Sequence, residues 1–450
     1  MATIAQVTEA MQELLTQITE QVDAEIHYTL RPDIAKFTAS TLVQTLAFGL
    51  LAHPNATLEQ LAQMAARLGV FVSPQAIDDR FTLRTASLLR TVLTRSVSQV
   101  IASDPVAIPI LQRFTSILVQ DSTIIVLPDA LAEHARGCGH EPNTNTAASL
   151  KCGLQLDLLH GTITQVNLTD GRFPDQHLPL TTAWLPPGSL HLADLGFFDL
   201  DVLAAYNAMG VFWLSKLTPR TLVSFDDQAP QGLLAFIKAL GPVAQWDGEV
   251  SVGAKRQVRA RLLIQAVPQE VADQRRRRIR EDAKRRGRTP SADALALAAW
   301  TILITNVPVE LLSLEEALVV AKVRWQIELI FKLWKSHGLV DQWRTNQPVR
   351  ILCEVYAKLL AMVIQQWIFI VSCWTYPDRS LVKAAQVVRD HIPELASARM
   401  RPSRLAETLT TIQEVLRRTA RMNSRSKHPN TYQLLLALTT EDDFTSGTSE

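Results

Sequence analysis

The chain has 450 residues, of which 47% are hydrophobic and 20% charged. This length supports two or three domains with their own cores, and the composition excludes a disordered chain. The net charge of +1 hides an asymmetry, because residues 255–288 contain thirteen Lys or Arg and only four Asp or Glu. A positive segment on an otherwise acidic protein indicates a polyanionic partner.

The cysteines and the apolar segments bear on where the protein works. The four cysteines are scattered without metal-binding spacing, which argues against a zinc site and fits a reducing cytoplasm. The N-terminus has no basic segment before an apolar run, so no signal peptide is expected. The most apolar window, residues 359–374, is interrupted by Gln365 and Gln366 and is predicted to be a buried helix rather than a membrane span. We therefore expect a cytoplasmic protein without a membrane partner.

Residues 1–108 are predicted to form a helical N-terminal DNA-binding region. A capping-box pattern begins one helix at Thr57, and Ser73 followed by proline begins another. Two short helices joined by a glycine-containing turn suggest a helix-turn-helix over residues 57–81. An ordinary helical hairpin is the alternative, because two aspartates on the second helix are unfavourable for phosphate contact.

From Phe114 the pattern changes to strands. The expected elements are a strand at 115–121, a hairpin at 150–168, a strand at 189–194, a helix at 199–209 and a strand at 211–217. Asp121 ends the first of these strands and Asp194 ends the strand at 189–194. The pattern predicts an α/β fold in which a mixed sheet is flanked by helices.

The second half of the chain interrupts and then resumes this pattern. Strands are expected at 249–252 and 258–267, a basic helix or arm at 275–288, and a core strand at 300–306. The expected domains follow from these elements. A helical region at 1–108 precedes the first part of the catalytic core at 109–217, and a β-rich basic insertion at 218–299 separates it from the second part of the core at 300–347. Residues 348–450 form a helical C-terminal region.

The stretch 320–338 has the period of a helix. Arg324, Glu328 and Lys335 share one stripe of this helix. An adjacent stripe is apolar and contains Ile327, Ile330 and Trp334. One face could therefore pack on a core while the other presents a carboxylate between two cations. The alternative is a surface helix with ion pairs between successive turns.

Asp121, Asp194 and Glu328 would form a metal site if they converged. Three neighbouring carboxylates repel one another and need a divalent cation, and oxygen ligands favour Mg²⁺, for which Mn²⁺ can substitute. Two such ions promote phosphodiester transfer. Each aspartate taken alone is better explained as a turn residue at the end of a strand, but the three acids in this order, with the basic segment between the second and the third, favour the metal site.

The segments around these acids resemble the IS4 family of transposases, which have an RNase H-like catalytic core with a DDE triad. The matching segments are VQDST around Asp121, HLADLGFFD around Asp194 and RWQIELIFKLWK around Glu328. Arg324, Glu328 and Lys335 match the spacing of the family's Y-x2-R-x3-E-x6-K signature. Ala321 occupies the tyrosine position, which departs from the family and affects the expected grip on the DNA end.

The resemblance implies the remaining roles. Arg324 and Lys335 would contact phosphates beside the scissile bond, and a tryptophan of the insertion, Trp300 or Trp246, would stack on a flipped base. The arginine run Arg275, Arg276, Arg277 and Arg278 would contact DNA phosphates. The expected partners are double-stranded DNA, as element ends and target, and a second copy of the chain in a homodimer. A bacterial, nucleoid-associated location in the cytoplasm is implied.

The sequence thus predicts a DNA transposase that cleaves the ends of an insertion sequence and joins the 3′-OH ends to target DNA. Two alternatives remain open. One is an inactive or domesticated derivative that binds DNA sequence-specifically, which Ala321 leaves open. The other is a metal-dependent nuclease that only hydrolyses. Since the sequence has no GxxxxGK[ST] loop, no use of ATP is expected.

Overall fold

The computed structural model describes residues 4–29, 37–97, 101, 103–141, 144–178, 185–225, 228–254, 257–423 and 429–445. The chain divides into two compact units. Unit 1 comprises Met1–Gln112, Val119–Thr181 and Trp325–Gln433; unit 2 comprises Arg113–Leu118, Thr182–Arg324 and Leu434–Glu450. The five segments expected from the sequence remain a prediction, because the two units group the chain differently.

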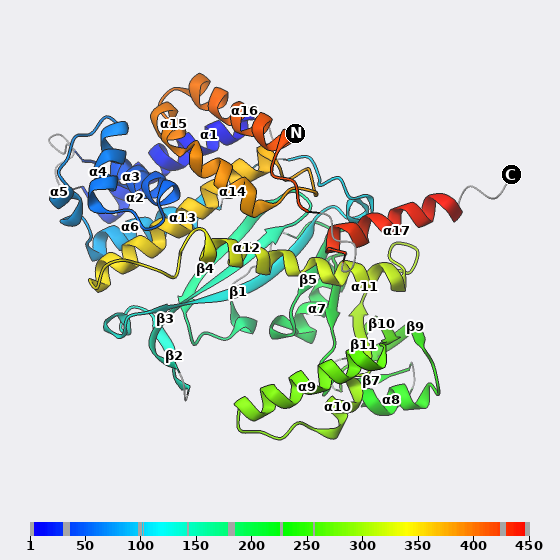
Figure 1. Cartoon of the computed structure of the whole chain (residues 1–450). Coiled ribbons are helices and arrows are strands. Elements are labelled where there is room, and N and C mark those ends of the chain that lie inside the picture. The colour runs from blue at the N-terminus through cyan, green and yellow to red at the C-terminus, as the bar shows by residue number, and fades with distance from the viewer. Residues whose placement is uncertain are drawn as a thin grey trace. The chain divides into compact units, whose positions relative to one another are not determined.

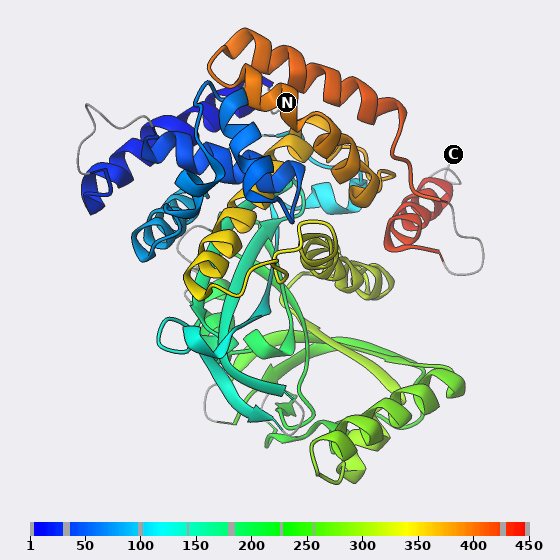
Figure 2. The same cartoon turned by 60° about the vertical axis from the view of Figure 1, so that its left-hand side comes forward.

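Unit 1 gathers helices from both ends of the chain. The N-terminal ones are α1 (Ile4–Glu13), a π-helical turn (Leu14–Ile18), α2 (Thr19–Ile26), α3 (Ala39–Ala52), α4 (Leu58–Arg67), α5 (Pro74–Asp78) and α6 (Leu83–Ser96). The later ones are α12 (Trp325–Ser336), α13 (Pro348–Ser372), α14 (Leu381–Asp390), α15 (Ile392–Ala398) and α16 (Pro402–Arg418). In Figures 1 and 2 the blue and orange helices lie together, and α13 packs on α3, α6 and α16.

Helix α13 is the core of unit 1. All its residues from Ile351 to Ser372 are buried. By length and composition alone it could cross a membrane, but it is enclosed by protein, as the core helix of a globular domain is. The buried helix expected around residues 359–374 is therefore confirmed.

The segment expected to form a helix-turn-helix is a helical hairpin with a very short second helix. The capping box between Thr57 and Gln60 is present, and Gly69 makes the turn with φ 84°. Helix α5 has only five residues, and Arg350 of α13 donates to Asp78 at 3.0 Å. This favours the ordinary hairpin, and DNA contact at 57–81 remains a prediction.

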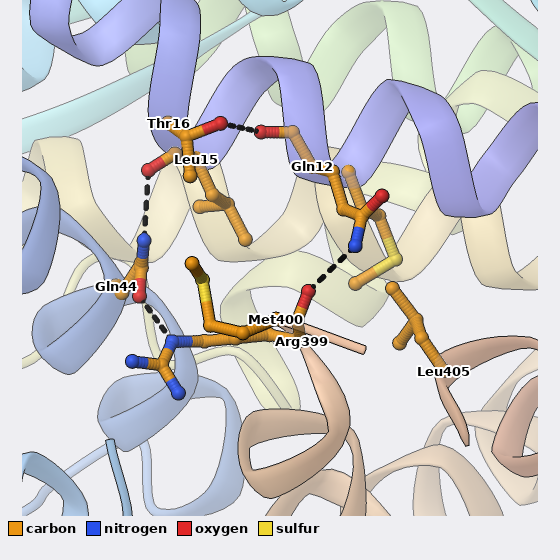
Figure 3. A pocket seen from close by; sticks show the side chains of 8 residues that line it. Gln12, Leu15, Thr16, Gln44, Arg399, Met400 and Leu405 are labelled. Carbon is orange, nitrogen blue, oxygen red and sulfur yellow. Dashed lines mark hydrogen bonds between the residues drawn. The ribbon is translucent and has the colours of Figure 1, made fainter. Parts of the chain in front are cut away.

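A half-buried arginine joins the N-terminal and C-terminal helices beside a small recess (Figure 3). Arg399 donates from Nε to Gln44 and from Nη2 to the Leu68 carbonyl at the end of α4, the latter at 2.6 Å. Its own carbonyl accepts from Gln12 of α1 at 2.9 Å. One residue thus connects α1, α3 and α4 to the turn after α15, and burial lowers its pKa.

The strands of unit 1 are β1 (Ile117–Leu127), whose first two residues belong to unit 2, β2 (Arg136–Glu141), β3 (Thr144–Asp157) and β4 (Thr162–Asp170). Antiparallel β3 and β4 form the predicted hairpin, which turns at His160 and Gly161. A Cβ on Gly161 (φ 78°) would lie 2.6 Å from the Trp374 ring, so this turn needs glycine.

Unit 2 contains a mixed sheet in the order β5-β6-β11-β10-β9-β7-β8. Its strands are β5 (Leu190–Ala193), β6 (Phe212–Lys216), β7 (Leu222–Ser224), β8 (Gln231–Gly232), β9 (Gln245–Val252), β10 (Val258–Ala266) and β11 (Trp300–Thr305). Strands β5 and β6 are parallel, whereas β6, β11, β10 and β9 pair antiparallel. The predicted fold class, an α/β fold with a mixed sheet flanked by helices, is confirmed.

The helices of unit 2 are α7 (Leu200–Ala208), α8 (Leu233–Ala239), α9 (Gln269–Arg285), α10 (Ala292–Leu297) and α11 (Leu314–Val323), while α17 (Thr431–Thr445) begins in unit 1. Residues 218–299 therefore hold three helices besides the expected strands. They do not form a separate sheet, because β10 pairs with β11 over six residue pairs. The basic helix expected at 275–288 is present as α9, and Lys255 and Arg256 lie outside the described residues.

Lys358 lies within α13 with 1% of its surface exposed. Its Nζ donates to the carbonyls of Leu339 at 3.1 Å and Gln342 at 2.6 Å. Burial lowers the pKa of Lys358 to about 8, against the opposing effect of Glu354 and Asp341. A lysine amine that is protonated in the unfolded chain at pH 9 is thus largely neutral in the folded protein.

We predict from this lowered pKa that Lys358 makes the free energy of unfolding rise with pH above about pH 8. The penalty for burying the charge is fully present below about pH 8 and is relieved as the pH approaches the ordinary lysine value of 10.5. The free energy of unfolding of wild type relative to Lys358→Met should rise by up to about 3 kcal/mol over this range. Urea unfolding of both proteins between pH 7 and 10.5 measures the difference, and a flat difference would contradict the lowered pKa.

Candidate active site

Asp121 lies in the middle of β1 rather than at its end. The strand continues to Leu127 because the residues after Asp121 are rich in β-branched side chains. This corrects the expectation that the strand ends at the acid. Asp121 is half-buried, and its Oδ1 accepts a hydrogen bond from the backbone N–H of Ser122 at 2.8 Å.

A polar network anchors the loop after β4 to the residue next to Asp121. Ser122 Oγ donates to Asp175 Oδ1 at 2.7 Å, and Lys151 Nζ donates to the same oxygen at 2.9 Å. Lys151 also donates to the Phe173 carbonyl at 2.5 Å, and only 9% of its side chain is exposed. Sequence reasoning missed this lysine, although a lysine inside an otherwise apolar strand is a signal that it has a buried partner.

The helix expected over 320–338 is two helices. α11 ends at Val323 and α12 begins at Trp325, and the boundary between the units falls between Arg324 and Trp325. The buried residues of α11 recur every third position (Leu314, Ala317, Val320 and Val323). Arg324, between the two helices, keeps right-handed helical angles (φ −50°, ψ −32°), so the interruption is a single residue.

Helix α12 is fixed on β1 by its own lysine. Lys335 Nζ donates to the Ile124 carbonyl of β1 at 2.9 Å. The predicted apolar stripe is confirmed, because Ile327, Ile330 and Trp334 are each no more than 2% exposed. Glu328, two turns before Lys335, is half-buried. Asp121 and Glu328 therefore belong to two elements of unit 1 that are in direct contact.

Asp194 belongs to unit 2 and is described within that unit alone. It directly follows β5, as predicted, and is half-buried. Its carbonyl accepts from the Phe197 N–H at 2.9 Å in a single 3₁₀ turn, Leu195–Phe197. Within the described part of the chain, no three His, Cys, Asp or Glu side chains are grouped closely enough to hold a metal ion. The triad of Asp121, Asp194 and Glu328 therefore remains a prediction.

The predicted DNA-contacting arginines of α9 differ in their surroundings. Arg275 donates to the Trp300 carbonyl at 2.8 Å and to Thr301 Oγ1 at 3.0 Å, and burial lowers its pKa. Arg276 donates to the Leu295 carbonyl at 3.1 Å and pairs with Asp273 at 2.7 Å. Arg277 and Arg278 are exposed. The first two thus fix α9 to its own unit, whereas the next two face solvent.

The two candidate tryptophans of unit 2 both pack against its apolar cluster. Trp246 meets Phe236 edge to face, with ring centroids 5.5 Å apart. Trp300 is half-buried at the start of β11. Trp300 therefore has a packing role within unit 2, while base stacking by its exposed part is untested.

The chain belongs to the transposase DDE domain family. The family described as "Transposase DDE domain" matches residues 112–364, which is more than half of the chain. This match spans β1, β5 and α12, the elements that carry Asp121, Asp194 and Glu328. The transposase identity expected from the sequence is thereby confirmed.

Insertion-sequence transposases match almost the whole chain. The transposase of IS231F from Bacillus thuringiensis subsp. israelensis is 24% identical, covering 95% of this chain and 94% of the relative. The transposase of IS231C from B. thuringiensis subsp. berliner is 25% identical over the same shares. That of IS1151 from Clostridium perfringens is 24% identical over 73% of each chain. These relatives confirm the resemblance to IS4-type transposases.

One solved structure, a piggyBac transposase synaptic complex with hairpin DNA, aligns with a TM-score of 0.46 and 11% identity. The alignment covers 96% of this chain and 88% of that one. A TM-score below 0.5 is too low to add to the family assignment.

The Lys151–Asp175 pair gives a testable prediction. Asp175→Asn removes the carboxylate that compensates the charge of the nearly buried Lys151 ammonium. Because the side chain of Asp175 is 36% exposed, the loss of stability is smaller than for a fully buried pair. We expect unfolding free energy to fall by about 1–3 kcal/mol. Thermal unfolding measures this, with Glu133→Gln, a change at an exposed position of the same unit, as the control. Equal stability of the two variants would show that the pair contributes nothing.

Proposed function

We propose that this transposase cleaves the ends of an insertion sequence and joins the freed 3′-OH ends to target DNA, with Asp121, Asp194 and Glu328 as its acidic triad. The observation that carries the proposal is the attachment of α12 to β1 through Lys335 and the Ile124 carbonyl. This contact connects the helix of Glu328 to the strand of Asp121 within one unit.

The spacing along the two elements supports the pairing of these acids. Glu328 precedes Lys335 by seven helical residues, or about 10.5 Å at 1.5 Å per residue. Asp121 precedes Ile124 by three strand residues, or about 10 Å. Where a helix and a strand run in the same direction, as α12 and β1 do in Figure 1, equal lengths from one shared contact bring the two acids level.

The donor set fits a hard divalent cation. Asp121 and Glu328 offer only oxygen and are half-buried, which favours Mg²⁺, with Mn²⁺ as a substitute, over softer metals. Bound there, the cations would supply activation of the attacking oxygen and neutralisation of the charge on the leaving oxygen. The protein's part is to hold the carboxylates: the Ser122 N–H restrains Asp121, and the Lys335 contact restrains α12.

Double-stranded DNA, as element ends and target, is the proposed substrate. Arg324 would grip a flanking phosphate, and Lys335 has two further N–H donors besides the one on Ile124. Exposed Arg277 and Arg278 would contact phosphates further away, and Trp300 would stack on a base. A homodimer on the DNA and a bacterial, nucleoid-associated location in the cytoplasm complete the proposal.

A cleavage assay on labelled duplex with flanking element ends tests the triad. With Mg²⁺ or Mn²⁺ we expect nicking and strand transfer, and with EDTA neither. Since Glu328→Gln and Asp121→Asn each remove a charged oxygen ligand, they should lower nicking by about 100-fold or more while DNA binding persists. The matched control is Glu315→Gln on the exposed side of α11.

Three outcomes separate the alternatives. Wild-type nicking by Glu328→Gln would overturn the assigned triad. Nicking without strand transfer by the wild type would favour a nuclease that only hydrolyses. Specific binding without nicking under either metal would favour the inactive derivative, in which Ala321 replaces the signature tyrosine.

The split between the arginines of α9 predicts two different phenotypes. Arg277→Ala with Arg278→Ala should reduce the salt dependence of DNA binding, by up to about 0.9 in log–log slope for each lost phosphate contact, without changing stability. Arg275→Ala should lower the melting temperature, because two hydrogen bonds to β11 are lost. Binding titrations at several salt concentrations and thermal unfolding measure both. An unchanged slope for the double variant would remove α9 from the DNA interface.

A further inference from the structure

The C-terminal end of α12 is met by two cations from helices later in the chain. Arg389 of α14 donates from Nη2 to the His337 carbonyl at 2.7 Å. Lys358 of α13 donates to the carbonyls of Leu339 at 3.1 Å and Gln342 at 2.6 Å. With Lys335 on β1, three separate elements hold the last turn of α12 and the loop after it.

These contacts satisfy a specific physical need. The last carbonyls of a helix have no partner within it and carry partial negative charge, so the Arg389 cation on the His337 carbonyl, directly after α12, is favourable. Lys358 acts further along, on two carbonyls of the loop. The loop is also constrained: Leu339 has φ 47°, a left-handed conformation that a leucine rarely adopts. Lys358 binds the carbonyl of this residue. Lys358 therefore adds a side-chain contact to a turn that is also held by backbone hydrogen bonds from Val340 to the Trp334 carbonyl at 3.2 Å and from Gln342 to the Leu339 carbonyl at 3.1 Å.

A small tilt at this end would be transmitted to Glu328. Nine residues separate Glu328 from His337, or about 13 Å along the helix axis. A rotation of about 4° about the clamped end would therefore move Glu328 by about 1 Å, a displacement that can reduce catalysis about 100-fold. Arg389 and Lys358 bind backbone about 13 Å or more along the chain direction of α12 from Glu328, so they would affect Glu328 by orienting the helix and not by touching the carboxylate.

We propose that Lys358 and Arg389 are positioning residues for the active site: by clamping the C-terminal end of α12, they hold Glu328 level with Asp121. The inference rests on the proposed function for the role of Glu328, but the clamp itself does not. It gives the C-terminal helices α13 and α14 a part in catalysis, although neither carries a proposed catalytic residue.

The same unit offers a matched control. Arg379, between α13 and α14, donates to the Leu416 carbonyl at 2.9 Å and to the Arg417 carbonyl at 2.7 Å, at the end of α16. It is buried and makes the same kind of contact as Arg389, but α16 carries no proposed site residue. Loss of Arg379 should weaken the fold without moving Glu328.

The first experiment measures the Mg²⁺ concentration that gives half-maximal nicking. Arg389→Gln and Lys358→Met should raise it by about fivefold or more with duplex binding unchanged, and Arg389→Lys should restore most of the loss. Arg379→Gln should lower the melting temperature but leave the Mg²⁺ midpoint unchanged, because a smaller folded fraction reduces the amplitude and not the midpoint. An equal shift in Arg379→Gln, or none in a folded Arg389→Gln, would overturn the positioning role.

The second experiment does not depend on activity. Hydrogen–deuterium exchange of the amides at 328–342 should be faster in Arg389→Gln and Lys358→Met than in wild type, and unchanged in Arg379→Gln. If the wild type never nicks DNA, the proposed function fails while this result still tests the clamp. Unchanged exchange in both clamp variants would overturn the clamp even in an active enzyme. Arg389→Lys serves as the mild variant should a larger change prevent folding.

Discussion

Unit 1 depends on the polar side chains buried on helix α13. Burying an amide or a charge is unfavourable unless it finds a partner, so each of these groups must bind something specific. Lys358 binds the loop after α12, and Gln366 donates to the Gly161 carbonyl of the β3–β4 turn at 2.6 Å. Arg350, which is partly buried at the start of α13, binds Asp78 of α5. Apolar packing alone would let α13 slide or rotate, whereas these contacts fix its register against three distant segments.

This constraint explains how a helical region can matter to chemistry placed on a strand and another helix. Strand β1 lies next to β3 in the sheet, and α13 reaches that sheet through its packing on β4 and its bond to the Gly161 turn. It also holds the loop that follows α12. Helix α13 thus contacts both the sheet that contains the strand of Asp121 and the loop that follows the helix of Glu328. The distance between the strand and the helix therefore does not depend on the Lys335 contact alone.

The sequence predicted those features that local chemistry dictates. The capping box at Thr57, the hairpin at 150–168 and the burial of α13 all follow from residues that are close together in the chain, and each is present. The acids at 121, 194 and 328 were proposed because their surroundings resemble a family signature, and their role as a triad stays a prediction. What the sequence missed depends mostly on partners outside the local stretch: Lys151 pairs with Asp175, Lys358 binds the loop after α12, and Arg389 binds the His337 carbonyl. Periodicity cannot report such contacts.

The break at Arg324 also changes how the missing tyrosine should be understood. The backbone of Arg324 keeps right-handed helical angles (φ −50°, ψ −32°), and the boundary between the two units falls directly after it. Here Ala321 and Arg324 belong to unit 2, while Glu328 and Lys335 belong to unit 1. In the proposed arrangement, Glu328 is positioned by contacts that follow Arg324 in the chain, on β1, α13 and α14. Replacing the tyrosine therefore alters the part of the signature assigned to gripping DNA and leaves intact the contacts that place Glu328.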